Sequence, residues 1–160
     1  MISLWTSFGV SNMIKKDYVL GFMFSPDMER VVLLIKTKPE FQKGKLNGVG
    51  GKIEDGESPL KAMVREFQEE TGLDTEEKEW TYCGKFTEVI NTDVLYSGQA
   101  NIYVYKCISD KGSSAESLTE EVVGNFKVSH LKNLPLMKSL NWIIPLLQYE
   151  QKTNFDVVFF

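Results

Sequence analysis

Residues 51–73 read GKIEDGESPLKAMVREFQEETGL, and the fold can be worked out from this stretch outward. Ser58 is a favourable N-cap residue, and Pro59 suits the first helical position because a proline there gives up no helical hydrogen bond. Gly72 suits the left-handed residue that ends a helix. These signals predict a helix that runs from Pro59 to about Thr71.

One face of the predicted helix is apolar. Its members follow the helical spacing of i, i+3, i+4 and i+7, and they are Leu60, Met63, Val64 and Phe67. A stripe of this kind is expected to pack against a hydrophobic core.

Three glutamates flank the stripe: Glu66, Glu69 and Glu70, with Ala62 between them on the helical wheel. The small Ala62 side chain predicts room for a ligand. Glu69 and Glu70 lie at the negative end of the helix dipole, which disfavours each by about 0.3–1 kcal/mol, and Glu66 is a like-charge i,i+4 neighbour of Glu70. The alternative is a solvated helix face, but this crowding favours a site for a hard cation such as Mg²⁺ or Mn²⁺.

Before the helix, residues 47–52 read NGVGGK and predict a glycine-rich loop that lets a ligand approach the backbone. The segment is not a Walker A motif, because neither Gly44-Lys45 nor Gly51-Lys52 has the required glycine spacing or a following Ser or Thr. Phosphate binding and a tight structural turn are both open for this loop.

Taken together, Gly51, Glu57 and residues 65–73 (REFQEETGL) have the spacing of a Nudix box, and the chain resembles the Nudix hydrolases over about residues 17–150. Phe67 departs mildly, since the family usually has an aliphatic residue there. The resemblance implies an α+β fold, an α/β/α sandwich with a mixed sheet between helices. It also implies hydrolysis of a nucleoside diphosphate linked to another group, with Mg²⁺ or Mn²⁺ as cofactor.

The resemblance also implies roles for the residues of the box. Glu69 and Glu70 would be the core metal ligands, with the Gly51 carbonyl completing the site. Glu66 would bind metal or orient the catalytic water. The remaining pair, Glu57 and Arg65, would fasten the loop to the helix.

A further acid from a later loop often joins the metals or serves as base in this family. Glu120 and Glu121 are the candidates here, with Glu116 a weaker one, and the choice between them is open.

For the substrate, residues 44–52 resemble the MutT-like branch, in which an asparagine beside the glycines reads a base edge. Asn47 has that position, Phe41 matches a base-stacking phenylalanine by spacing, and Lys36 or Lys38 could hold a phosphate. That branch has two aspartates ahead of its last helix, whereas residues 137–141 (MKSLN) contain no acid, and Asn141 is the polar candidate.

The expected reaction is conversion of a (d)NTP or an oxidised purine nucleoside triphosphate to a nucleoside monophosphate and pyrophosphate. ADP-ribose and dinucleoside polyphosphates are alternative substrates, although residues 89–91 (VIN) lack the proline and tyrosine marks of those branches. A non-catalytic nucleotide sensor is the alternative outside enzymes, and it is disfavoured because every box glutamate is present.

The composition excludes several classes. The chain has 160 residues, 42% hydrophobic and 25% charged, which fits one globular domain. A net charge of −4 gives no basic surface for nucleic acid, and six acids against two bases fall within residues 54–70. No secretory signal or membrane span is recognised, so a cytoplasmic monomer or homodimer with buried, reduced Cys83 and Cys107 is expected.

The apolar runs outside the first helix predict strands before and after it, and a second helix near the end of the chain. We expect residues 1–12 to be an N-terminal extension and residues 13–160 to form the domain. Strands are predicted at 18–24, 31–36, 80–90, 100–108 and 126–128, and the second helix at 136–149 with a kink at Pro145. The apolar residues 155–160 are expected to form a strand against the sheet or at a dimer interface.

Overall fold

The computed structural model describes residues 14–93, 96–149 and 153–159. The expected extension of residues 1–12 lies outside this range. Within the described part, no helix has both the length and the apolar character needed to cross a membrane.

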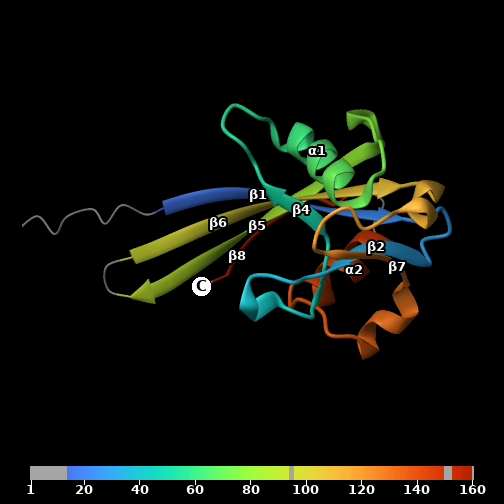
Figure 1. Ribbon diagram of the computed structural model, residues 1–160. Helices are drawn as coiled ribbons and strands as arrows, with labels where there is room; N and C mark the ends of the chain where they lie inside the picture. Colours follow the sequence, from blue (N-terminus) through green and yellow to red (C-terminus); the bar gives the residue numbers. More distant parts are fainter. Residues whose placement is uncertain (1–13, 94–95, 150–152, 160) are drawn as a thin grey trace, which may run out of the picture.

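A mixed β-sheet forms the centre of the molecule (Figure 1). Its strands are β1 (Ile14–Phe24), β2 (Arg30–Ile35), β3 (Leu46–Asn47), β4 (Val49–Lys52), β5 (Trp80–Asp93), β6 (Tyr96–Ile108), β7 (Val122–Lys127) and β8 (Phe155–Phe159). The main path runs β3-β2-β1-β6-β5-β8, while β4 pairs with β1 and β7 with β2. β1 is parallel to β6 and antiparallel to β4, and β8 is parallel to β5.

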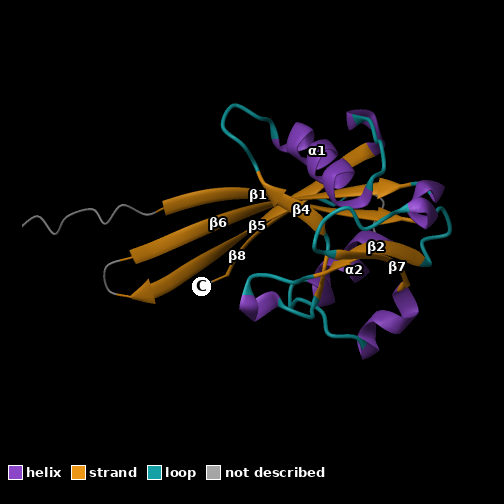
Figure 2. Ribbon diagram, viewed as in Figure 1, coloured by secondary structure: helices purple, strands orange, loops and turns teal. Residues whose placement is uncertain are grey.

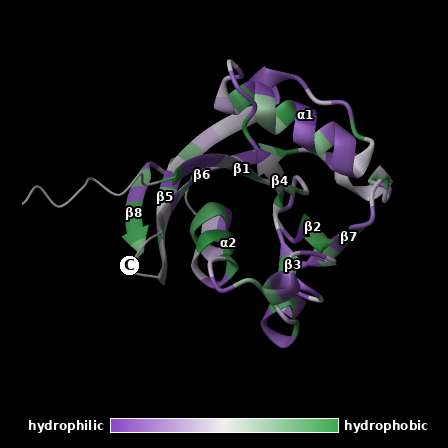
Figure 3. Ribbon diagram, turned by 60° about the vertical axis from the view of Figure 1, so that its left-hand side comes forward, coloured by the Kyte–Doolittle hydropathy of each residue, from purple (hydrophilic) through white to green (hydrophobic). Residues whose placement is uncertain are grey.

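Helices cover both faces of this sheet (Figure 2). α1 (Pro59–Thr71) packs on the face that carries Val19 and Met23 of β1, whereas α2 (Leu140–Tyr149) packs on the face that carries Leu20 and Phe22. Residues 19–24 of β1 and 31–34 of β2 are buried and form nearly continuous apolar runs, as expected for strands covered on both faces. Figure 3 shows the sheet curving between α1 and α2. The α+β class and the sandwich layering are confirmed.

The first helix is confirmed with its predicted bounds. The Ser58 hydroxyl accepts a hydrogen bond from the Lys61 amide at 3.2 Å, and Gly72 ends the helix with φ 71°. Phe67 is fully buried, as expected for a core residue. The prediction that the small Ala62 side chain leaves room for a ligand is wrong, because Ala62 is fully buried in the core.

The second helix begins at Leu140, four residues later than predicted. The helix starts later because backbone hydrogen bonds tie the preceding residues to β3: the Leu46 amide donates to the Pro135 carbonyl, and the Met137 amide donates to the Leu46 carbonyl. Leu136 forms an isolated parallel bridge with Leu46. The segment before α2 is therefore extended along β3.

Two further segments differ from the prediction. The glycine-rich stretch is strand β4 rather than a loop, since residues 49–52 pair with residues 18–21 of β1. The strand expected at 126–128 is β7, which pairs with β2 from Val122 to Lys127, and Val128 already starts a 3₁₀ turn. The expected C-terminal strand is confirmed as β8.

Candidate active site

Arg65 of α1 lies at the centre of a hydrogen-bonded cluster. Its Nε and Nη2 donate to the two carboxylate oxygens of Glu57 at 2.8 and 2.9 Å. Nη2 also donates to the Lys52 carbonyl at 3.1 Å, which joins the helix to β4. The Arg65 hydrogen bond holds the pKa of Glu57 below its usual range, so Glu57 stays ionised. This forked pair fastens the loop of residues 53–58 to the helix.

Glu66 lies against the glycines of β4. A Cβ atom added to Gly51 would overlap the Glu66 carboxylate, so only glycine lets this carboxylate approach the strand. The Glu66 side chain is 13% exposed and accepts from Arg65 Nη1 at 2.8 Å. Burial raises its pKa, although the Arg65 hydrogen bond acts in the opposite direction. Gly50 is equally constrained, because a Cβ there would overlap the Val19 carbonyl.

Glu69 and Glu70 continue the acidic face of α1. Glu69 is more exposed, at 56% of its side chain, and accepts from Arg65 Nη1 at 3.3 Å. Glu70 accepts from the Thr119 hydroxyl at 2.7 Å, a contact that the sequence did not predict. Among the described residues, no three acidic, histidine or cysteine side chains converge as a ready metal cluster. The box glutamates share one region, but they face different partners.

The late loop places its two candidate acids in different surroundings. Glu121 is buried, forms an ion pair with Lys36 at 3.1 Å and accepts from the Thr37 amide at 3.2 Å. Glu120 is 71% exposed and lies 3.4 Å from Lys38, which is equally exposed. The weaker candidate, Glu116, is exposed and contacts the end of α1 through its backbone amide.

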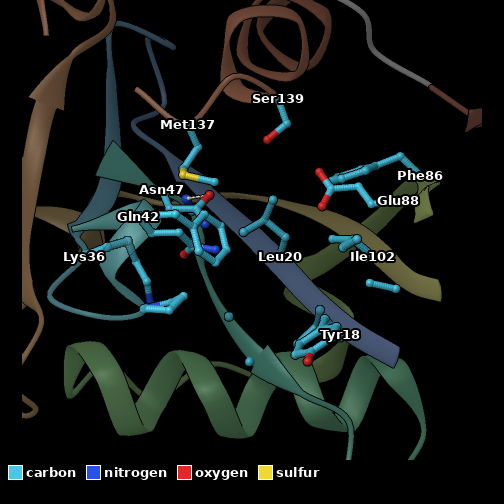
Figure 4. A pocket seen from close by; sticks show the side chains of 17 residues that line it. Tyr18, Leu20, Lys36, Gln42, Asn47, Phe86, Glu88, Ile102, Met137 and Ser139 are labelled. Carbon is cyan, nitrogen blue, oxygen red and sulfur yellow. Dashed lines mark hydrogen bonds between the residues drawn. The ribbon is translucent and has the colours of Figure 1, made fainter. Parts of the chain in front are cut away.

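A pocket of about 420 Å³ opens on the α2 side of the sheet and reaches the β4 glycines. Its apolar walls come from Leu20, Phe86, Ile102 and Met137 (Figure 4). This volume lies in the range of small-molecule sites. Polar side chains also line it, and they are Tyr18, Lys36, Gln42, Asn47, Glu88 and Ser139.

The predicted substrate residues divide between the pocket and the surface. Asn47, Phe41 and Lys36 line the pocket, with Phe41 67% exposed. Lys38 and Asn141 are not among the lining residues, and Asn141 donates its side-chain amide to the Lys138 carbonyl. Met137 and Ser139 line the pocket instead, because α2 starts only at Leu140.

The NUDIX domain model matches residues 15–146, most of the chain. The chain belongs to the Nudix family.

Two curated relatives of the chain differ in their described roles. A methanol dehydrogenase activator from Bacillus methanolicus is 27% identical over 124 residues, which span 78% of this chain and 61% of that protein. An oxidized purine nucleoside triphosphate hydrolase from Danio rerio is 33% identical over 86 residues, which span 54% of this chain and 52% of that protein. Both matches cover less than two thirds of the relative's own length.

Solved structures support the Nudix fold. The MutT protein from Bacillus halodurans has a TM-score of 0.66 at 23% identity, covering 88% of this chain and 89% of that one. The NUDIX domain of NrtR from Shewanella oneidensis, solved with ADP ribose, has a TM-score of 0.65 at 18% identity, covering 85% and 86%. At these identities the likeness concerns the fold.

Three residues of the candidate site were not predicted from the sequence: Thr119, which contacts Glu70, and Glu88 and Ser139, which line the pocket. Glu88 could have been found from the sequence. It lies two residues after Phe86 in a predicted strand, so it places a charge on the same face as an apolar residue expected to be buried. Thr119 and Ser139 could not have been found in this way, since their positions depend on loop contacts with α1 and β3.

Proposed function

We propose that this protein is a Nudix pyrophosphohydrolase that hydrolyses a nucleoside triphosphate to a nucleoside monophosphate and pyrophosphate. The observation that carries the proposal is the junction at Gly51, which lines the pocket and also packs directly against the Glu66 carboxylate. A nucleotide whose base occupies the pocket would therefore extend its phosphates toward the acidic face of α1.

The donor set fits a divalent cation. The carboxylates of Glu66, Glu69 and Glu70 offer oxygen atoms, the ligands that Mg²⁺ and Mn²⁺ prefer, and Gly51 lies directly against the Glu66 carboxylate. We assign these four residues as the ones that would hold Mg²⁺ or Mn²⁺. Such a cation would neutralise diphosphate charge and lower the pKa of a bound water.

The remaining groups position the reaction. Arg65 fixes the direction of Glu66 and Glu69 by donating to both, and Glu57 holds Arg65 in turn. Phosphoryl transfer depends chiefly on positioning and charge neutralisation, so this cluster would contribute by holding the carboxylates in place. Thr119 does the same for Glu70.

For the late-loop acid we propose Glu121 rather than Glu120. Glu121 is buried and bound to Lys36 of the pocket wall, whereas Glu120 is exposed and paired with Lys38 outside the pocket. Glu121 would keep Lys36 oriented beside the substrate, and Lys36 in turn would supply a positive charge there.

Within this class we propose an oxidised purine nucleoside triphosphate as the substrate, on the basis of the pocket and of one relative. The Danio rerio protein is described as an oxidized purine nucleoside triphosphate hydrolase, and Asn47, Phe41 and Lys36 line a pocket of suitable volume.

The buried, free thiols of Cys83 and Cys107 support a reducing compartment such as the cytoplasm.

A nucleotide panel tests the proposal. Purified protein is incubated with Mg²⁺ and, separately, with dGTP, 8-oxo-dGTP, dATP, dCTP, dTTP, ADP-ribose, NADH and Ap4A, and the products are identified by chromatography. A nucleoside monophosphate and pyrophosphate formed from a triphosphate support the proposal. Preferential cleavage of ADP-ribose or Ap4A would replace the substrate class, and no turnover of any compound would favour a nucleotide sensor.

A further inference from the structure

Among the described residues that line the pocket, one is acidic: Glu88 of β5, an exposed residue whose neighbours in the lining include the apolar Phe86 and Ile102. Figure 4 shows its carboxylate pointing into the space, with Ser139 near it in this view and Asn47 across the pocket. Opposite Glu88 in the sheet are Ala100 of β6 and Phe159 of β8, neither of which is basic.

No hydrogen bond or ion pair to the Glu88 carboxylate exists among the described residues. Lys85, three residues earlier, points to the other face of the sheet and lies 3.6 Å from Asp156. Glu88 therefore presents oxygen acceptors to whatever enters the pocket.

Asn47 presents the complementary function. Its side-chain oxygen already accepts from the Gly48 amide at 2.9 Å, which leaves the NH₂ group to donate. The pocket thus offers hydrogen-bond donors from Asn47 and acceptors from Glu88.

We propose that Glu88 is a specificity-determining residue that accepts hydrogen bonds from two adjacent N–H groups of a guanine-type base. This inference rests on the proposed function, because it assigns the base end of that nucleotide site. Guanine carries two neighbouring N–H donors beside a carbonyl acceptor, which matches a carboxylate and an amide donor together. Adenine places a ring-nitrogen acceptor where guanine has a donor, so a carboxylate there repels it.

The charge of Glu88 also sets the orientation of the nucleotide. A carboxylate repels phosphates, so the triphosphate must lie at the other end of the pocket, beside Gly50 and Gly51. This is the end that reaches Glu66 of α1. Base reading and hydrolysis are thereby assigned to opposite ends of one pocket.

The test compares the wild type with Glu88→Gln, which keeps the size of the side chain but removes its charge. Glu77→Gln serves as the charge-matched control, since Glu77 is exposed and remote from the pocket. For each protein, kcat/KM is measured with dGTP, with dITP, which lacks the 2-amino group, and with dATP. Isothermal titration calorimetry with dGMP, dIMP and dAMP provides a readout that does not require turnover.

The wild type and Glu77→Gln should prefer dGTP over dITP by about tenfold or more, because the analogue leaves an acceptor unpaired. In Glu88→Gln this ratio should fall close to one, while dATP is used no worse than before. An unchanged ratio, or an equal loss for all three nucleotides, would overturn the assignment, as would the absence of binding by every monophosphate. If no triphosphate is hydrolysed but dGMP binds better than dIMP in a Glu88-dependent way, the proposed function fails and Glu88 still reads the base.

Discussion

At the residue scale, a few side chains hold the proposed catalytic carboxylates in place. Arg65 donates to Glu57, Glu66 and Glu69, so one guanidinium group joins the loop before α1 to the acidic face of the helix. A lysine could not replace it, because a single ammonium group lacks the planar fork that binds Glu57 through two nitrogens.

Gly51→Ala tests the contact between β4 and α1. The added methyl group would overlap the Glu66 carboxylate and displace it. Since misplacing a reacting group by about 1 Å can cost on the order of 10²-fold in rate, we expect kcat/KM to fall by about that factor. Lys52→Ala, at the exposed neighbouring position of the same strand, should keep nearly full activity in the same assay. Equal activity of the two variants would contradict the positioning role.

Glu121→Gln and Glu120→Gln form a matched pair on the late loop. Removing the charge of Glu121 leaves Lys36 without its buried ion-pair partner, so we expect kcat/KM to fall by about tenfold or more. The ion pair of Glu120 and Lys38 is exposed and therefore weak, so Glu120→Gln should keep the kcat/KM of the wild type. Steady-state kinetics with dGTP measure both, and a larger loss in Glu120→Gln would reverse the assignment.

At the element scale, how far each segment could be predicted depends on where its hydrogen bonds go. The sequence predicts α1 from Pro59 to about Thr71, as observed, because Ser58, Pro59 and Gly72 specify its ends locally. The start of α2 and the strand character of β4 were mispredicted, since both depend on pairing with distant segments, β3 and β1. The same long-range pairing explains why Ser139, and not Asn141, lines the pocket.

β8 provides a prediction at this scale. Phe155 and Val157 pack against the α2 side of the core, and the ring centroid of Phe155 lies 5.3 Å from that of Trp142. Truncation after Asn154 exposes this surface and the edge of β5, so we expect a lower melting temperature and concentration-dependent association. Thermal unfolding and light scattering measure these changes. A truncated protein that matches the full chain in both would show that β8 is dispensable.

At the scale of the whole molecule, the acidic balance of the chain has a local origin. The excess of acids over bases within residues 54–70 equals the net charge of −4. Carboxylates concentrated in this way attract divalent cations, which in turn attract the phosphates of a nucleotide. An acidic protein is therefore compatible with an anionic substrate.

The buried thiol of Cys107 predicts how stability depends on pH. Burial raises its pKa from 9.0 in the unfolded chain to about 11. Below about pH 9 the thiol is protonated in both states, whereas between these values only the unfolded chain ionises, so the free energy of unfolding falls as pH rises. Urea unfolding at about pH 8.5 and about pH 10.5 should show a larger loss for the wild type than for Cys107→Ala. Equal losses would contradict the burial effect.

The central claim is most directly tested by product stoichiometry with dGTP. Wild-type protein in Mg²⁺ should release dGMP and pyrophosphate in equal amounts, and excess EDTA should stop the reaction. Glu69→Gln should show the same circular dichroism spectrum and melting temperature but lose about 10²–10⁴-fold in kcat. Full turnover by Glu69→Gln, or release of orthophosphate in place of pyrophosphate, would contradict the account.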